Sequence, residues 1–286
     1  MMVYKFFRLF TSFLLLSFSA SQDTGAWNLV SPEREFSISG IGHLKRGMVV
    51  VHDNKREGQA RVGIISGKNE YAKLTWPADA LPFDLEALDM IPGKPNRFIA
   101  MESSGKCYDL HFNNRSGKLN LKNVFSIPGV KRPMNLEGIA VFRMGGSMWA
   151  AWGDRGKNQF PAALYWGRLY LYSSKVETAG SFEFTVPFPE SDVRHLSDLE
   201  ITEDGTCWIS SASDPGDDGP FDSAVYLLGA FRENGRTINF IPEKSGQPYR
   251  VYKGHKIEAI ALESGKLTCG TDDENFGASL LVQDAN

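Results

Sequence analysis

A glutamate recurs four times in the chain, each time after a polar residue and a leucine or isoleucine, at the start of an apolar run. The four segments read DLEAL, NLEGI, DLEIT and KIEAI, and their glutamates are Glu86, Glu137, Glu200 and Glu258. Carboxylates crowded around a narrow opening repel one another, so such a set is costly unless a cation binds to it. Oxygen ligands on loops suit Ca²⁺, or another hard divalent cation such as Mg²⁺. The sequence therefore predicts that the four glutamates are metal ligands.

A second set of acids stands at the end of the next apolar run after each of these glutamates, and after Ser39, which takes the place of the glutamate in a preceding unit. Its members are Asp53, Glu102, Asp154, Asp214 and the pair Asp272–Asp273. We predict that Glu102 and Asp214 complete the metal site. The alternative is that the glutamates recur because the repeats share an ancestor, and that they cap strand-start amide groups and hold neighbouring repeats together.

Cations and a histidine near these acids would support the hydrolysis of a phosphate ester. That chemistry needs a metal to polarise the phosphoryl oxygen and cations to meet the developing charge. The predicted catalytic residues are Asp154, Arg155, His195 and Lys106. The opposing interpretation is that the cations are solvated loop charges and that the histidine is structural. The sequence has no G-x-S-x-G segment and no glycine-rich phosphate loop, so serine-hydrolase and nucleotide-binding chemistry gain no support.

The elements that would position these residues are short β-strands in a repeating order. Each glutamate opens a unit of roughly fifty residues, with four strand-like runs separated by turn residues, or three in the last unit. A further unit precedes them at FSISGIGHL, with Ser39 in place of the glutamate. No segment shows a long amphipathic helical period, so we expect few helices. The sequence predicts an all-β fold, a single β-propeller with five four-stranded blades.

The two ends of the chain predict how the ring closes. The last unit stops after its third run, SLLVQ, and the run AWNLVS at 26–31 precedes the first full unit. Pairing these two runs would complete the last blade and cover an open sheet edge. The first strand of each blade lines the central channel, and the second returns antiparallel to the same face. Both sets of acids are therefore expected at one mouth of the channel.

The N-terminal segment has the pattern of a secretory signal. Lys5 and Arg8 precede an apolar run at 13–18, and small residues follow at 19–21. We expect residues 1–21 to be a signal peptide, residues 22–286 to form the propeller, and the protein to be secreted or periplasmic. The alternative is an uncleaved membrane anchor, for which the apolar run is short.

Composition narrows the possible partners. The chain has 286 residues, 42% of them hydrophobic, and a formal net charge of -3, which argues against a nucleic-acid partner. No later stretch approaches the ~20 apolar residues of a membrane-spanning helix. We expect no membrane association beyond the signal peptide, a monomer, and a small anionic substrate or a glycan as partner. The three cysteines lie in apolar runs, where a small buried side chain is expected.

The blade pattern also resembles a known family. The segments DLEAL…RFIAMES, NLEGIAV…AAWGDRG and DLEIT…DGTCWISS are similar to the inner-blade motifs of secreted, phytase-like propellers grouped as "esterase-like activity of phytase", over most of residues 36–285. The resemblance implies a β-propeller, export, divalent-cation binding and hydrolysis of phosphate esters. It also implies that the motif acids lie at the channel mouth: Glu86, Glu137, Glu200, Glu258, Glu102, Asp154 and Asp214. Ser39 interrupts the acid set in one blade.

Two functions from different classes are consistent with these residues. The first is a metal-dependent hydrolase of phosphate esters or related anionic esters. The second is a non-catalytic propeller that binds a glycan, a peptide or a protein and carries a structural metal. Aromatic residues for sugar stacking would come from Trp76, Trp152, Trp166, Phe160 and Phe221. An ion site open to solvent beside Arg155 or Lys106 favours the first function, and an aromatic shelf favours the second.

Overall fold

A computed structural model describes residues 21–22 and 25–285 of the chain. This part of the chain is built from strands, with only two short 3₁₀ helices, Arg34–Phe36 and Glu274–Phe276. None of its helices has the length and apolar character needed to cross a membrane. The predicted signal peptide lies outside the described residues, except for Ser21 at its end.

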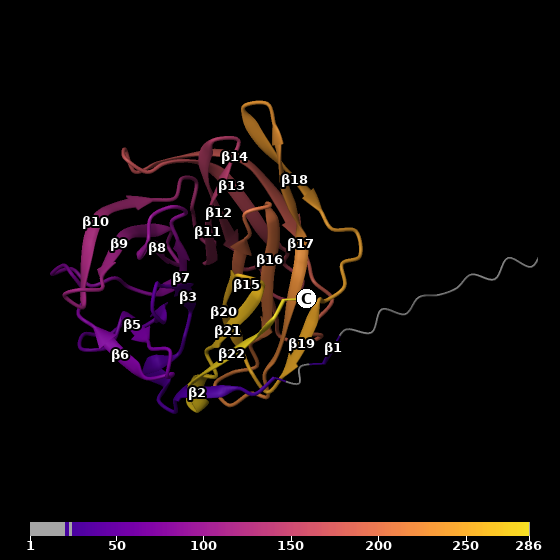
Figure 1. The fold of residues 1–286 in the computed structure, drawn as a ribbon. Coiled ribbons are helices and arrows are strands. Elements are labelled where there is room, and N and C mark those ends of the chain that lie inside the picture. The colour runs from indigo at the N-terminus through magenta and orange to yellow at the C-terminus, as the bar shows by residue number, and fades with distance from the viewer. Residues whose placement is uncertain (1–20, 23–24, 286) are drawn as a thin grey trace, which may run out of the picture.

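The strands form five sheets arranged as a ring of blades (Figure 1), as the repeat pattern predicted. In the first blade the strands are β3 (Gly40–His43), β4 (Met48–Val51), β5 (Val62–Ile65) and β6 (Tyr71–Leu74). In the second they are β7 (Leu85–Met90), β8 (Arg97–Glu102), β9 (Lys106–Asn113) and β10 (Lys118–Ser126). In the third they are β11 (Leu136–Met144), β12 (Ser147–Asp154), β13 (Ala162–Tyr170) and β14 (Lys175–Phe184). Neighbouring strands within these blades run antiparallel, so successive loops alternate between the two faces of the disc.

The fourth blade departs from the four-stranded pattern. Its inner strands are β15 (Val193–Ile201), β16 (Thr206–Ser213) and the long β17 (Asp222–Asn234). One half of β17 pairs with β18 (Thr237–Pro242) and the other half with β19 (Arg250–Lys253). The short strand β1 (Ser21–Gln22) adds to β19 in parallel.

The fifth blade contains both ends of the described chain. It consists of β20 (Ile257–Glu263), β21 (Lys266–Thr271) and β22 (Ala278–Asp284), and its outermost strand is β2 (Asn28–Ser31). β2 pairs antiparallel with β22, at the lower edge of the ring in Figure 1. The predicted closure of the last blade by an N-terminal strand is therefore confirmed.

The inner strands crowd around the axis of the ring, and glycine makes their close approach possible. A Cβ atom on Gly40 would lie 2.6 Å from the backbone nitrogen of Leu88 in the next blade. A Cβ atom on Gly138 would lie 2.9 Å from the backbone nitrogen of Leu199. Both distances are too short for a side chain beside backbone atoms, so larger residues at these positions would push the blades apart.

Two buried aspartates join the inner strands of neighbouring blades. Asp89 accepts a hydrogen bond from the Val141 backbone nitrogen at 2.5 Å, and Asp198 accepts one from that of Ile260 at 2.8 Å. Val141 and Ile260 lie on β11 and β20, the innermost strands of their blades. On the side that faces the channel, these strands have no strand to pair with. Because an unpaired buried N–H costs free energy, the aspartates stabilise the blade contacts.

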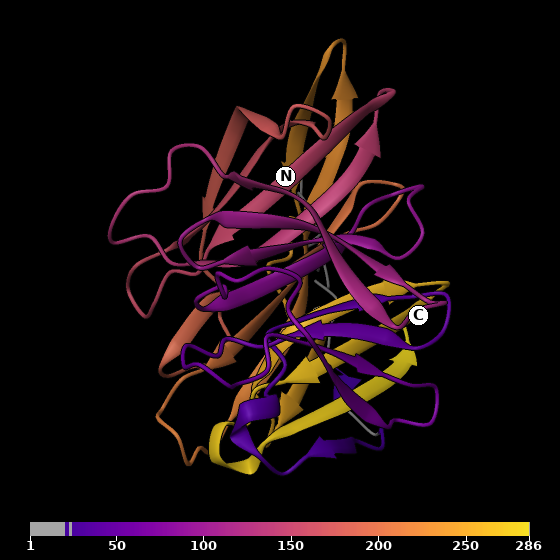
Figure 2. The same ribbon diagram turned by 90° about the vertical axis from the view of Figure 1, so that its left-hand side faces the viewer.

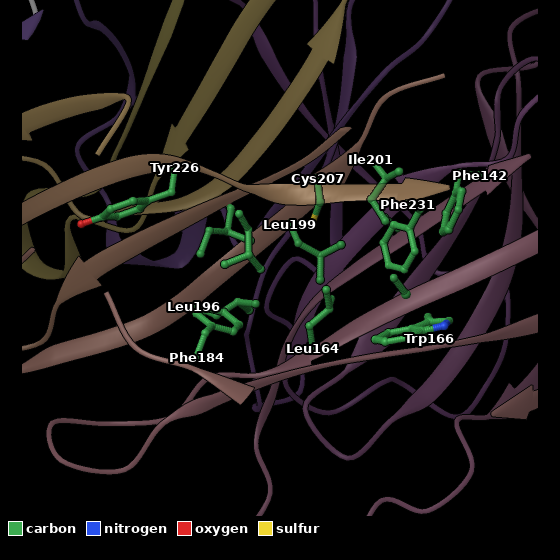
Figure 3. Packing of buried hydrophobic residues seen from close by; sticks show 14 of the residues in the cluster. Phe142, Leu164, Trp166, Phe184, Leu196, Leu199, Ile201, Cys207, Tyr226 and Phe231 are labelled. Atoms are coloured by element: carbon green, nitrogen blue, oxygen red, sulfur yellow. The ribbon is translucent and has the colours of Figure 1, made fainter. Parts of the chain in front are cut away.

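Figure 2 shows the ring of blades turned by 90° from the view of Figure 1. Apolar clusters fill the space between neighbouring blades. Figure 3 shows the cluster between the third and fourth blades, where the Trp166 and Phe231 rings meet edge to face at 5.4 Å. Cys207 lies in this cluster, and all three cysteines are buried, as expected. Each large side chain buried in this way contributes about 1.5–3 kcal/mol to stability.

Removal of β2 is expected to lower the thermal midpoint. A chain that begins at residue 32 loses the backbone pairing of β2 with β22 and the packing of Val30 against the fifth blade, whereas a chain that begins at residue 25 keeps both. We expect the shorter chain to melt at least about 5 °C lower than the longer one. Equal midpoints in differential scanning calorimetry would show that β2 is not needed to close the ring.

Candidate functional site

Three of the predicted glutamates lie at one mouth of the central channel, at equivalent positions in their blades. Glu86, Glu137 and Glu258 are each the second residue of an inner strand. In every case the strand pairing shifts register at this residue, between Leu85 and Ala87, Leu136 and Gly138, and Ile257 and Ala259. A bulge of this kind re-aims the side chain of the extra residue. All three glutamates are buried.

Arg194, and not Glu200, occupies the corresponding position of the fourth blade. Strand β15 begins at Val193, ahead of the DLEIT segment, so the motif glutamate lies well inside the strand. The hydrogen bond from Asp214 N to Asp192 O matches that from Ser103 N to Asp84 O in the second blade, which aligns Arg194 with Glu86. Glu200 pairs with Trp208 farther along β15, away from the mouth, so its predicted role as a ligand beside the other glutamates has no geometric basis.

Arg194 and Lys256 neutralise one side of the mouth. Arg194 lies 2.6 Å from Glu258, 3.1 Å from Asp214 and 3.8 Å from Glu137. Lys256, which is 1% exposed, lies 3.0 Å from Glu258. Burial disfavours the charge on Arg194, but the carboxylates of Glu258 and Glu137 outweigh it and raise the pKa of the guanidinium.

Lys256 has two further carboxylate partners, and Glu137 has a second cation beside it. Lys256 also lies 3.4 Å from Asp272 and 2.5 Å from Glu274, and Arg155 lies 3.0 Å from Glu137. On this side of the mouth the protein thus supplies its own cations, and Glu137 and Glu258 do not need a metal to balance their charge.

The other side of the mouth holds a compact group of carboxylates. Asp53, Asp84 and Glu86 each offer one oxygen, and these oxygens all lie within 4.8 Å of one another. Asp53 follows β4 in the first blade, and Asp84 and Glu86 flank the start of β7 in the second. Lys55 is the nearest cation, 2.7 Å from Asp84. We refer to Asp53, Asp84 and Glu86 as the acid triad.

Electrostatics within the acid triad favour a bound cation. Burial, together with repulsion from Glu137 and Asp84, raises the pKa of Glu86 well above its usual range. Burial and the nearby Asp272 raise the pKa of Asp53 to about 6. The pKa of Asp84 is lowered despite its burial, because Glu86, Lys55 and Ser103 donate hydrogen bonds to it. Without a cation, the raised pKa values of Asp53 and Glu86 disfavour the ionised forms of these two carboxyls. A bound cation would lower both pKa values again.

The donor set of the acid triad fits a hard divalent cation. It consists of carboxylate oxygens only, from two loops and a strand start, with no histidine or cysteine among them. Ca²⁺ and Mg²⁺ prefer such ligands, whereas Zn²⁺ and copper prefer nitrogen or sulfur.

A cavity of about 430 Å³ opens beside Asp53 on the same face of the disc. Its wall contains both cations and acids: Arg34, Lys55 and Arg56 on the one hand, and Glu35, Asp53 and Asp272 on the other. Lys55 belongs to both the cavity and the acid triad, so the two are continuous. The carboxylates of the acid triad therefore lie next to the cations of the cavity, and the cavity is large enough for a small anion.

The other predicted ligands lie near the mouth but are engaged within the protein. Glu102 accepts hydrogen bonds from Tyr108 Oη at 2.6 Å and from the Phe83 backbone nitrogen at 3.1 Å. Asp214 lies 3.1 Å from Arg194, as noted, and 3.4 Å from Lys157. Both therefore serve as strand-end anchors, in line with the alternative given for the repeated acids.

The predicted catalytic residues differ in how they are held. Asp154 accepts a hydrogen bond from the Asn135 backbone nitrogen at 3.0 Å, and burial raises its pKa. Arg155 reaches Glu137 and remains partly exposed at the mouth. The Lys106 ammonium lies 5.0 Å from the Tyr108 ring and has no ion-pair partner among the described residues.

His195 is held as a structural residue. Its Nδ1 accepts a hydrogen bond from the Val186 backbone nitrogen at 3.2 Å, and its Nε2 donates to the carbonyl of Asn158 at 2.7 Å. The side chain is buried and both ring nitrogens are occupied. This geometry argues against the predicted acid–base role, because neither nitrogen is free to exchange a proton with a substrate.

The aromatic residues proposed for sugar stacking are mostly part of the core. Trp76, Trp152, Trp166 and Phe221 are buried, and Phe160 alone among the five is exposed. The face that carries the acid triad therefore has no aromatic shelf built from these residues.

Comparisons with known proteins bear on the fold. No protein-family model and no curated protein sequence matches the chain. Among solved structures, the crystal structure of an exo-1,5-α-L-arabinanase from a bovine ruminal metagenomic library is similar, with a TM-score of 0.50 over 87% of this chain and 92% of that chain. The chain is a five-bladed β-propeller. At 10% sequence identity the feature that the two chains share is the propeller fold.

The raised pKa of Asp53 predicts how stability depends on pH without metal. Between pH 4 and 6 the folded chain keeps a proton on Asp53 that the unfolded chain has lost, so this group makes the folded state less stable as pH rises. We expect Asp53 to lower the free energy of unfolding by about 2–3 kcal/mol as the pH rises from 4 to 6.5. Urea unfolding with chelator should show a flatter pH profile for Asp53→Asn than for the unmodified chain. Parallel profiles would contradict this assignment.

Proposed function

We propose that the protein is a divalent-cation-dependent hydrolase of phosphate esters or related anionic esters, and that the acid triad and the adjacent cavity form its site. The observation that carries the proposal is the closeness of three carboxylates that lack sufficient cations of their own, next to a cavity walled by Arg34, Lys55 and Arg56. A propeller hydrolase has the same fold, which is consistent with hydrolysis in general terms. We also propose that the protein is exported and acts as a monomer.

Asp53, Asp84 and Glu86 would hold the cation, which would polarise the ester oxygen and lower the pKa of a bound water. Lys55 lies between the triad and the cavity, so its ammonium can bind a phosphoryl oxygen while keeping Asp84 ionised. Arg34 is oriented by Asp217 at 2.9 Å and Glu274 at 2.5 Å, and it would help to position the anion in the cavity. Such fixed cations are effective because they need little rearrangement as charge develops.

The test is hydrolysis of a panel of phosphomonoesters and phosphodiesters by the purified protein, after its metal content has been measured. We expect activity with Ca²⁺ or Mg²⁺ that falls at least about 100-fold with chelator and returns on adding metal. Lys55→Ala should lower activity on phosphate esters, whereas Lys68→Ala, an exposed lysine on the opposite face, should not.

Three outcomes would overturn this function. Hydrolysis that is unaffected by chelation would exclude a metal-dependent reaction. Cation binding at the triad without hydrolysis of any ester would support the alternative, a non-catalytic propeller with a structural metal. An α-1,5-arabinan oligosaccharide belongs in the panel, because cleavage of that glycan alone would replace phosphate esters by glycosides as the substrate class.

A further inference from the structure

A second cavity lies on the face of the disc opposite the acid triad, between the second and third blades. Its volume is about 310 Å³. Lys94, from the turn between β7 and β8, forms one side. The other side comes from the third blade, where Arg143 ends β11 and Arg168 and Tyr170 end β13. Since β11 starts at the acid mouth with Leu136 and ends beside this cavity, the thickness of the disc separates the two sites.

The charge in this cavity is of one sign. Lys94, Arg143 and Arg168 line it, and no acidic residue does. Among the described residues none of the three cations has an ion-pair partner within 4 Å. The nearest candidate, Glu177, is opposite Arg168 in the sheet, but it is already paired with Lys175 at 2.6 Å and with the Tyr170 hydroxyl at 3.0 Å.

The cavity also offers aromatic and apolar surface. Tyr172 is 96% exposed at the tip of the turn between β13 and β14, and Tyr170 is stacked under Arg168 at 5.5 Å. Met148, Leu169 and Leu171 complete the lining. A tyrosine that is so exposed gains nothing from the core, and tyrosine rings are well suited to pack against the C–H face of a sugar.

We propose that this cavity binds an acidic oligosaccharide, with sugar rings against Tyr172 and Tyr170 and carboxylate or sulfate groups on Arg143, Arg168 and Lys94. Arginine binds both kinds of group through paired N–H donors, and its planar group accommodates a flat anion. A neutral glycan would leave the three cations without partners, and an anion without rings would leave the tyrosines unused. The combination of charge and aromatic surface therefore selects the acidic sugar.

The test is isothermal titration calorimetry in about 50 mM salt, where charged contacts are not strongly screened. Chelator is present throughout, so that the acid triad cannot hold sugar through a bound cation and the result is independent of the proposed hydrolase. The probes are an oligogalacturonate, which carries carboxylates, and a heparin oligosaccharide, which carries sulfates. A neutral oligosaccharide of equal ring number and inorganic polyphosphate are the comparators.

We expect one or both acidic oligosaccharides to bind at least tenfold more tightly than either comparator. Arg143→Ala/Arg168→Ala should weaken binding at least tenfold, and Tyr172→Ala should weaken it about fivefold. Lys131→Ala/Arg132→Ala removes the same charge from an exposed loop near the acid mouth and should change affinity less than twofold. Circular dichroism checks that each variant is folded.

Three results would overturn the proposal. The first is absence of binding by both acidic probes. The second is polyphosphate binding as tight as theirs, which would show attraction by charge alone. The third is an equal loss of affinity in the two double variants, which would place the sugar elsewhere on the protein.

Discussion

Replacing Lys256 by methionine is expected to lower the free energy of unfolding by about 3–5 kcal/mol. The lysine is 1% exposed, and its ammonium lies within 3.4 Å of Glu258, Asp272 and Glu274. Methionine keeps most of the volume but leaves three carboxylates facing one another in a space with little water. Uncompensated buried charges of this kind are among the most costly changes a folded protein can suffer.

Lys266→Met is the matched control for that change. Lys266 lies 2.6 Å from Asp284, as short as a strong ion pair, but both side chains are more than half exposed. An exposed pair contributes about 0–1 kcal/mol. Urea unfolding at pH 7 with chelator should therefore separate the two variants clearly. If both lose the same stability, the ion pairs of Lys256 are not what holds this side of the mouth together.

Calcium is expected to raise the thermal midpoint of the protein by about 5–10 °C at a concentration 100-fold above its dissociation constant. The shift follows because the cation binds the acid triad of the folded chain and relieves the repulsion that raises the pKa values of Glu86 and Asp53. Glu86→Gln removes one of three charged ligands and should abolish most of the shift.

Glu137→Gln is the control, because Glu137 occupies the same bulge position in the next blade and is already paired with Arg155 and Arg194. This variant should lose stability but keep the full calcium-induced shift. Calorimetry with and without calcium tests both variants. A shift that survives in Glu86→Gln and disappears in Glu137→Gln would place the cation on the other side of the mouth.

The fold could be predicted from the sequence because propeller blades repeat. Each blade repeats the same alternation of apolar and polar residues, so the signal is present five times, and the missing strand of the last unit matched the spare run before the first. The fourth blade was harder, since the division of β17 between β18 and β19 depends on a loop that leaves the sheet and returns to it.

The site could be predicted only in part. Glu86, Glu137 and Glu258 were found because the motif repeats in sequence as well as in space. Arg194 was missed because the irregular pairing between Arg194 and Asp198 displaces the start of β15 from the motif, and no sequence pattern marks such a shift. Asp84 was visible as the first residue of DLEAL, but its proximity to Asp53 depends on how two blades meet.

Lys256 shows a further limit of the sequence pattern. It is the first residue of the last motif, KIEAI, where the other three motifs begin with aspartate or asparagine. The exchange places a cation inside a ring of acids, so the carboxylates on that side of the mouth are already paired within the protein. The sequence does not reveal this pairing, because it depends on the folded positions of Glu258, Asp272 and Glu274 around Lys256.

The pairing of β2 with β22 has a consequence for how the chain is made. These two strands are separated by almost the whole described sequence, so during synthesis β2 must wait without its partner until the last blade has left the ribosome. Contacts between such distant segments form late and slowly. A nascent chain stalled before Ala278 would present two unsatisfied sheet edges at once, and at that stage neighbouring chains could exchange strands.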